Sequence, residues 1–172
     1  KKAYQKANEL FLLKTDPLVI IAETLKVMED LPCFDAGTGS FLNEFGEVEL
    51  DAAVMEGTDL KAGAVASIGS FKNPGYIAMS ILKNTEHVLL VGPGAEAYAQ
   101  SAGFEKVPSH HLIHPREIEA HKRWIEMGKP DAKIFFSKPE TGKEPHKRGT
   151  VGVCIGIKKT DGTYNLYSGT ST

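Results

Sequence analysis

The chain has 172 residues, a length that suits one domain, and its 20 basic and 22 acidic residues leave a formal net charge of −2. This balance excludes the strongly basic surface that is typical of proteins bound to nucleic acid or anionic membranes. No apolar run reaches the roughly 18 residues of a membrane-spanning helix, and two cysteines, Cys33 and Cys154, do not make a disulfide framework. We therefore expect a cytoplasmic protein with neither nucleic acid nor membrane as a partner.

The N-terminal half of the chain carries helix and strand patterns in turn. Asp16-Pro17 predicts a helix start, because Asp suits the N-cap and Pro the first helical position. Apolar residues then recur at helical spacing until Pro32 ends the pattern. Apolar and polar residues alternate over residues 48–54, which predicts a half-buried strand. Residues 62–68 are small and apolar, which predicts a second, closely covered strand.

Helix and strand signals continue in the middle of the chain. Asn73-Pro74 repeats the pattern of a helix start. Residues 88–91 predict a short buried strand, and residues 94–102 predict a small helix that ends at Gly103.

The C-terminal part contains a long irregular segment and a hairpin. Residues 108–149 are rich in His, Pro and Lys and predict a variable loop, with one helical pattern at residues 117–127. Residues 151–157 and 164–169 flank Asp161-Gly162, which is typical of a hairpin turn. Strands, helices and hairpins without a regular βαβ rhythm favour an α/β fold of the α+β kind, with sheets covered by helices.

The junction between the loop and this hairpin is the most informative point for chemistry. It reads Gly149-Thr150-Val151-Gly152. A threonine hydroxyl is a poor nucleophile unless a base takes its proton. Cleavage before Thr150 would give this residue a free α-amine, whose pKa of about 7.7–8 leaves a useful unprotonated fraction near neutral pH. On the pattern alone, the sequence favours an ordinary strand residue at Thr150, because β-branched residues favour strands.

Many ordered motifs surround this junction. In chain order they are Phe34-Asp35-Ala36-Gly37-Thr38-Gly39-Ser40, Leu42-Asn43-Glu44, Gly46-Glu47-Val48-Glu49-Leu50-Asp51-Ala52, Val54-Met55-Glu56-Gly57, Ala62-Gly63-Ala64-Val65-Ala66, Asn73-Pro74, His87-Val88-Leu89-Leu90-Val91-Gly92, Gly149-Thr150-Val151-Gly152 and Gly169-Thr170-Ser171-Thr172. Through them the chain resembles, over nearly its whole length, the plant-type asparaginase and isoaspartyl-peptidase family. The members of that family are N-terminal nucleophile (Ntn) hydrolases.

The resemblance implies a fold, a processing event and an activity. It implies an αββα sandwich, of which this chain would be a fragment truncated at both ends. Residues 1–172 would be part of one domain, with an α-subunit-like portion at 1–149 and the start of a β-subunit-like portion at 150–172. It implies hydrolysis of L-asparagine and β-aspartyl peptides by a dimer of αβ units, without a cofactor for catalysis. A glycosylasparaginase and a catalytically silent homologue are the alternatives, and the Gly before Thr150 favours the asparaginase branch.

The resemblance also implies the roles of particular residues. Autocleavage would fall between Gly149 and Thr150, and Thr150 would be nucleophile and base. Thr172 matches a threonine whose hydroxyl tunes the nucleophile. Asp35 stands where the family usually has Asn, and an ionised Asp only accepts hydrogen bonds. The residues that grip the substrate and form the oxyanion hole would lie beyond Thr172.

A structural sodium ion is a further implication of the resemblance. Main-chain carbonyls would hold it in the turn after the first predicted helix, and carbonyl oxygen suits a hard cation whatever the side chain. The matching positions are Met28, Glu29, Leu31, Phe34, Ala36 and Thr38.

Three other features carry weaker signals for a site. His110, His111 and His114 have a spacing that a metal could use on a helix, but no Cys or acidic ligand stands at good spacing, which favours a loop role. Gly92-Pro93-Gly94 lacks most of a phosphate loop and favours a plain strand-to-helix turn. Cys154 is interpreted as a buried strand residue.

Overall fold

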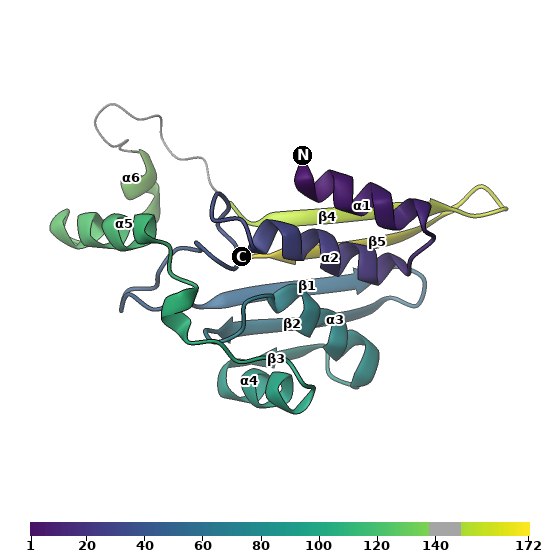
Figure 1. Ribbon diagram of the computed structural model, residues 1–172, viewed down its shortest axis with the longest axis horizontal. Coiled ribbons are helices and arrows are strands. Elements are labelled where there is room, and N and C mark those ends of the chain that lie inside the picture. The colour runs from purple at the N-terminus through teal and green to yellow at the C-terminus, as the bar shows by residue number, and fades with distance from the viewer. Residues whose placement is uncertain (138–148) are drawn as a thin grey trace.

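One mixed sheet is the frame of the molecule in the computed structural model, which describes residues 1–137 and 149–172. Five strands lie in the order β3-β2-β1-β5-β4 (Figure 1). The pair β2–β3 is parallel, and the other three pairs are antiparallel. The strands are β1 Leu50–Glu56, β2 Lys61–Ile68, β3 Leu89–Val91, β4 Val151–Lys158 and β5 Tyr164–Ser171.

Helices pack on one face of this sheet and extend beyond one end of it. Helices α2 and α3 lie across the sheet, α1 packs on α2, and α4 packs on β2 and β3 (Figure 1). Helices α5 and α6 form an arm beyond the end of the sheet at which β4 begins. The helices are α1 Lys2–Leu12, α2 Pro17–Glu29, α3 Pro74–Asn84, α4 Gly92–Ser101, α5 Pro115–Glu126 and α6 Ala132–Ser137, with a 3-10 turn η1 at Ser109–His111.

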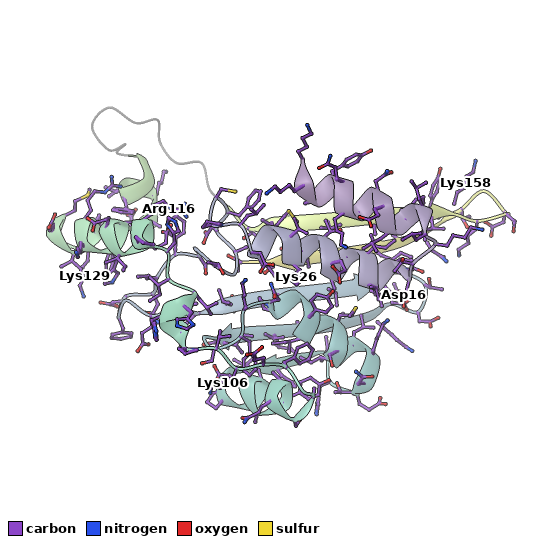
Figure 2. All side chains as sticks on the ribbon, in the orientation of Figure 1. Asp16, Lys26, Lys106, Arg116, Lys129 and Lys158 are labelled. Atoms are coloured by element: carbon purple, nitrogen blue, oxygen red, sulfur yellow. The ribbon has the colours of Figure 1, made fainter. Side chains whose placement is uncertain are left out.

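Helix α2 confirms the predicted start at Asp16-Pro17. Asp16 is the N-cap, and its Oδ1 accepts a hydrogen bond from the Leu18 N–H at 2.8 Å. Figure 2 shows Asp16 and Lys26 toward opposite ends of this helix. The side chains of Ile21 and Leu25 are fully buried. The helix therefore docks on the sheet through the apolar face that the sequence predicted.

The hydrophobic core lies between the sheet and helices α2 and α3. Leu50, Ala52 and Val54 point into it from alternate positions of β1, as the predicted alternation requires. Two glycines bring the layers close together. A Cβ on Gly63 would lie 2.3 Å from Ala78 O in α3, and a Cβ on Gly169 would lie 2.4 Å from Ile21 Cγ2 in α2.

The opposite face of the sheet is left uncovered by the described residues. Met55 and Leu166 are large apolar side chains exposed on this face, and Cys154 is exposed there as well. One helical layer on one sheet is half of the αββα arrangement predicted above. The α/β class is thus confirmed. The buried position predicted for Cys154 is wrong, because alternation directs its side chain away from the helices.

Of three other local predictions, two are confirmed and one is wrong. The hairpin of β4 and β5 is confirmed, with Gly162 at φ +86° in its turn. The helical pattern in the variable segment is confirmed as α5, and residues 138–148 of that segment lie outside the described residues. The buried strand at residues 88–91 is wrong in its burial, since Val88, Leu89 and Val91 are 52–61% exposed on an edge strand. Within the described part of the chain, no helix is long and apolar enough to cross a membrane.

Candidate active site

The two threonines singled out from the sequence meet at one end of the β4–β5 hairpin. The last recorded pair of this antiparallel ladder is Val151 with Ser171. Extending the same register by one residue sets Thr150 opposite Thr172. Directly opposed residues of antiparallel strands have Cβ atoms about 4.5–5.5 Å apart. The register therefore brings two threonines that are 22 positions apart in sequence to the same end of the hairpin.

Both threonines belong to the uncovered face of the sheet. Val151 and Ser171 are buried under the helices, with exposed fractions of 5% and 1%. Because side chains alternate along a strand, Thr150 and Thr172 point to the opposite face. Thr150 is exposed and Thr172 is half-buried. Thr170 lies on this face too, and its hydroxyl donates to Val151 O at 3.0 Å, which ties the two strand ends together.

The bond before Thr150 lies in open surroundings. Gly149 is exposed, and a Cβ built on it would meet nothing among the described residues within 4 Å. Gly149 and Thr150 precede the first residue of β4. No side chain of the described residues outside its chain neighbours thus crowds the Cα of Gly149.

Asp35 lies in the turn that follows α2. Its Oδ1 accepts a hydrogen bond from the Phe41 N–H at 2.9 Å, which closes the segment between them. An Asn at this position has the same acceptor in its amide oxygen, so this contact survives the exchange of Asn for Asp. No recorded contact joins Asp35 to Thr150 or Thr172, and the catalytic role of Asp35 stays a prediction.

The buried carboxylate of Glu29 lies beneath the strand end that carries Thr172. The sequence predicted a role only for the main-chain carbonyl of this residue, and its side chain was missed. Glu29 is 0% exposed, and its two oxygens accept from the Gly75 N–H at 3.0 Å and from Asn73 Nδ2 at 3.1 Å. Burial raises its pKa above the ordinary value, against the opposite effects of the Ser171 hydroxyl, Gly75 and Asn73. Ser171 Oγ is buried and approaches Glu29 without meeting hydrogen-bond geometry.

A signal for Glu29 was present in the sequence. It stands four residues after Leu25 and so lies on the buried face of α2. A charged residue on an apolar helix face needs a buried partner, and here the start of α3 supplies it.

The carbonyls of the predicted sodium site lie at the end of α2 and in the turn after it. Those of Met28, Glu29 and Leu31 already accept from Leu31 N, Thr38 N and Phe34 N. Those of Phe34, Ala36 and Thr38 receive no hydrogen bond from any described residue. The Thr38 hydroxyl is buried and has no partner within the described chain. The turn thus has spare oxygen ligands, and its chemistry fits a hard cation.

The arm of α5 and α6 contacts the turn after α2 through Arg116. Arg116 at the start of α5 donates through Nη1 to Pro32 O and through Nη2 to Gly39 O, the latter at 3.3 Å (Figure 2). Its Nε lies 2.5 Å from Oε1 of the buried Glu117. One guanidinium therefore joins the two ends of the turn.

The weaker features of the sequence do not form sites in the part of the chain that the structure describes. His110 and His111 meet ring edge to ring face at 4.5 Å, and no group of three His, Cys, Asp or Glu side chains there could hold a metal. Helix α4 starts at Gly92, so Gly92-Pro93-Gly94 is the strand-to-helix turn that was favoured.

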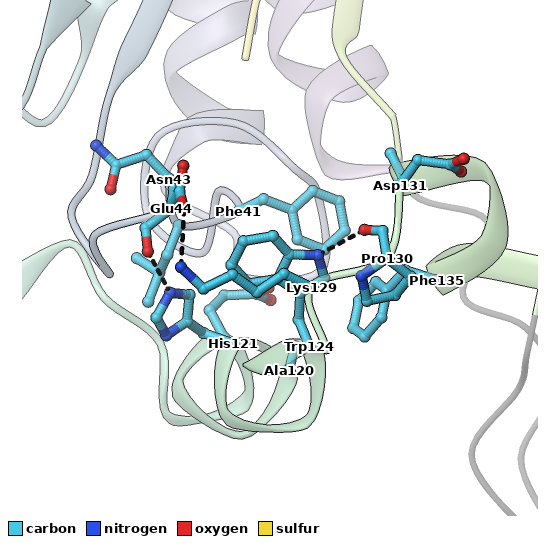
Figure 3. Close-up of a pocket in the computed structure, with 13 residues that line it drawn as sticks. Phe41, Asn43, Glu44, Ala120, His121, Trp124, Lys129, Pro130, Asp131 and Phe135 are labelled. Atoms are coloured by element: carbon cyan, nitrogen blue, oxygen red, sulfur yellow. Dashed lines mark hydrogen bonds and ion pairs between the residues drawn. The ribbon is translucent and has the colours of Figure 1, made fainter. Parts of the chain in front are cut away.

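A cavity of about 490 Å³ lies between the arm and the segment Phe41–Glu44 (Figure 3). Phe41, Trp124 and Phe135 give it aromatic walls. Lys129 and Glu44 also line it, with Lys129 Nζ 2.8 Å from Glu44 Oε1. Neither Thr150 nor Thr172 lines this cavity, so it is separate from the threonine pair.

Comparison with known proteins points to one family. A family model described as asparaginase matches residues 1–172. The plant-type L-asparaginase of Pyrococcus horikoshii is 42% identical over 164 residues, which are 94% of this chain and 51% of that protein. The isoaspartyl peptidase/L-asparaginase of Xenopus laevis is 36% identical over 125 residues, which are 73% of this chain and 40% of that protein. The chain spans about half the length of the first of these relatives.

Proposed function

Because this chain belongs to the asparaginase family, we propose that it carries the nucleophile of an autoprocessing threonine amidohydrolase. The proposed substrates are L-asparagine and β-aspartyl (isoaspartyl) peptides, in line with the names of its relatives. The observation that carries the proposal is the hairpin register, which pairs Val151 with Ser171 and, when extended by one residue, Thr150 with Thr172. A nucleophilic threonine with a second hydroxyl beside it has the parts that this chemistry needs.

Processing is the first step of the proposed mechanism. Thr150 Oγ attacks the carbonyl carbon of Gly149, and the peptide C–N bond breaks as its nitrogen takes up a proton. An ester then joins Gly149 to the Thr150 side chain. Water hydrolyses this ester, which releases a carboxylate on Gly149 and restores the Thr150 hydroxyl beside the α-amine freed in the first step. The open surroundings of Gly149 support this step.

Hydrolysis uses the amine that processing creates. The unprotonated α-amine of Thr150 takes the proton from its own Oγ, which attacks the side-chain carbonyl carbon of the substrate. Ammonia leaves from asparagine, or an amine leaves from a β-aspartyl peptide. Water then attacks the acyl-enzyme ester and releases aspartate. We assign the Thr172 hydroxyl the role of donating to Thr150 Oγ and tuning its reactivity, and the β4–β5 register supports this assignment.

Asp35 and the turn that contains it complete the proposed site. We assign Asp35 a place near the reaction centre from the family motif, and its bond to Phe41 supports a turn held in one shape. The carbonyls of Met28, Glu29, Leu31, Phe34, Ala36 and Thr38 would hold a sodium ion. Bound there, the ion would neutralise the carbonyl dipoles and stiffen the turn. The spare carbonyls and the Thr38 hydroxyl support this assignment.

The test is a product assay on the full-length protein. The assay measures ammonia released from L-asparagine, amine released from a β-aspartyl dipeptide and sugar amine released from glycosylasparagine. Wild type is compared with Thr150→Ala and with Thr160→Ala, a control in the exposed hairpin turn. We expect wild type and Thr160→Ala to hydrolyse the first two substrates, and Thr150→Ala to hydrolyse none. Activity retained by Thr150→Ala would refute the proposal, and hydrolysis of glycosylasparagine alone would move the protein to that branch.

A further inference from the structure

The ladder between β1 and β2 is interrupted beside Asp51. Leu50 pairs with Ile68, but Ala52 pairs with Val65, so β2 contains one residue more than β1 over this stretch. This is a β-bulge, a feature that is frequent next to active sites. Ser67 lies within it at φ +55°, a left-handed conformation that costs free energy for any residue other than glycine. Something must hold Ser67 there.

The Asp51 carboxylate holds the bulge. Its Oδ1 accepts a hydrogen bond from the Ser67 N–H at 2.8 Å, in place of the ladder bond that the bulge removes. The Ser67 hydroxyl in turn donates to Glu49 Oε1 at 3.1 Å. The side chains of Asp51 in β1 and of Glu49, just before β1, thus fix the strained residue of β2.

The backbone of the same aspartate holds Thr172. The Asp51 N–H donates to Thr172 O at 3.2 Å, and the Thr172 N–H donates to Asp51 O at 2.9 Å. Thr172 follows the last residue of β5, so this reciprocal pair fixes its backbone on the β1 side. On its other side lies Thr150. Thr150, Thr172, Asp51 and the bulge therefore form one row across the end of the sheet.

We propose that Asp51 is a positioning residue for the reaction at Thr150, an inference that rests on the proposed function. Its carboxylate keeps Ser67 in the bulge, and the bulge keeps the Asp51 backbone in the register that presents Thr172 to the nucleophile. Asp51 does not itself reach Thr150. With β5 between them and about 4.8 Å between neighbouring strands, their backbones are roughly 10 Å apart.

This role depends on a hydrogen-bond acceptor and not on a charge. Asn keeps an acceptor oxygen at the same place, whereas Ala removes it. Glycine at position 67 adopts a positive φ without strain, so it needs no carboxylate to hold it. A role of Asp51 as a charge near the α-amine of Thr150 would give the opposite result for Asn, and glycine at position 67 would not help.

The test uses the full-length protein and four variants: Asp51→Asn, Asp51→Ala, Ser67→Gly, and the double variant Asp51→Ala with Ser67→Gly. Intact mass gives the rate of cleavage before Thr150, and steady-state kinetics of the processed protein give kcat and KM. We expect Asp51→Asn and Ser67→Gly to stay within about twofold of wild type in both measurements. We expect Asp51→Ala to slow processing and lower kcat at least about fivefold with little change in KM, because it disturbs the reacting groups and not substrate binding. The double variant should recover most of both rates.

Each other outcome overturns a defined part of the inference. If folded Asp51→Asn is as slow as Asp51→Ala, charge and not positioning is the function of Asp51. If Asp51→Ala is as fast as wild type, Asp51 has no positioning role while the proposed function stands. If Asp51→Ala fails to fold, the double variant decides, since a folded but slow double variant contradicts a role through Ser67. If wild type is never cleaved, the proposed function is wrong and the positioning role is wrong with it.

Discussion

The packing of α3 on β2 gives the sharpest prediction about stability, through the variant Gly63→Ala. The added Cβ would lie 2.3 Å from Ala78 O and 2.4 Å from Leu82 N, far inside the normal contact distance of about 3.5 Å. Both obstructing atoms belong to the backbone of α3, so the helix must move away by about 1 Å. Overpacking of this kind costs about 1–3 kcal/mol. We expect the upper end for Gly63→Ala, because Ala78 and Ile81 are fully buried beside it.

Thermal unfolding of the full-length protein, followed by circular dichroism, measures this cost. A loss of about 3 kcal/mol should lower Tm by roughly 6 °C or more in a domain of this size. Gly94→Ala is the matched control. Gly94 lies in helix α4, and its new Cβ would meet nothing within 4 Å. The control should be neutral or stabilise by up to about 1 kcal/mol. Equal Tm values for the two variants would refute the close packing of α3 on the sheet.

Three further predictions concern the ends of elements. Asp16→Ala should cost about 1–2 kcal/mol in denaturant unfolding, from the lost cap of α2 and its half-exposed ion pair with Lys83. Burial raises the pKa of Asp16, but the Lys83 and Leu18 contacts outweigh it and hold this pKa below its usual value. The stabilisation is therefore present above the ordinary Asp pKa and should fade as the pH falls through the lowered value. If wild type and Asp16→Ala still differ in free energy of unfolding in strong acid, this reasoning is wrong. Glu29→Ala leaves the buried Gly75 N–H unpaired and removes one of the two acceptors of Asn73 Nδ2, so it should destabilise by about 2–3 kcal/mol; Glu29→Gln should be less harmful, and equal losses would argue against these hydrogen bonds. Thr172→Val should lower kcat at least about tenfold while Thr172→Ser keeps most of it, and unchanged turnover in Thr172→Val would remove this hydroxyl from the mechanism.

Structural features that depend on residues close together in sequence were predicted well. The start of α2 depends on two adjacent residues, Asp16 and Pro17, and the β4–β5 turn depends on Asp161-Gly162. The alternation in β1 follows from the pleat of a single strand. In each case the physical cause lies within a few residues of the element that it shapes.

Helix α1 was not predicted, and none of its residues is fully buried in the described structure. Its partly buried residues Ala3, Lys6, Ala7 and Leu10 do recur at helical spacing, but only one of them is a large apolar residue. The burial of Cys154 and of residues 88–91 was predicted wrongly. Strand propensity gives the element, but the neighbours on each face decide what covers it.

The candidate site divides in the same way. Thr150 and Thr172 were found through motifs, and the hairpin register gives them a shared location. The bulge at Ser67 and its contact with the Asp51 carboxylate were not predicted from the sequence, because they depend on a one-residue mismatch between two strands. The catalytic role of Asp35, the sodium ion, the single domain and the dimer of αβ units stay predictions.

The central claim is that Thr150 becomes an N-terminal nucleophile, and intact-mass analysis tests it most directly. The full-length protein and its Thr150→Ala variant are incubated side by side, and the masses are followed over time. The account predicts that wild type separates into two pieces, one ending at Gly149 and one starting at Thr150, while the variant stays whole. A wild-type protein that folds and stays whole, or a variant that is cut at the same bond, would contradict the account.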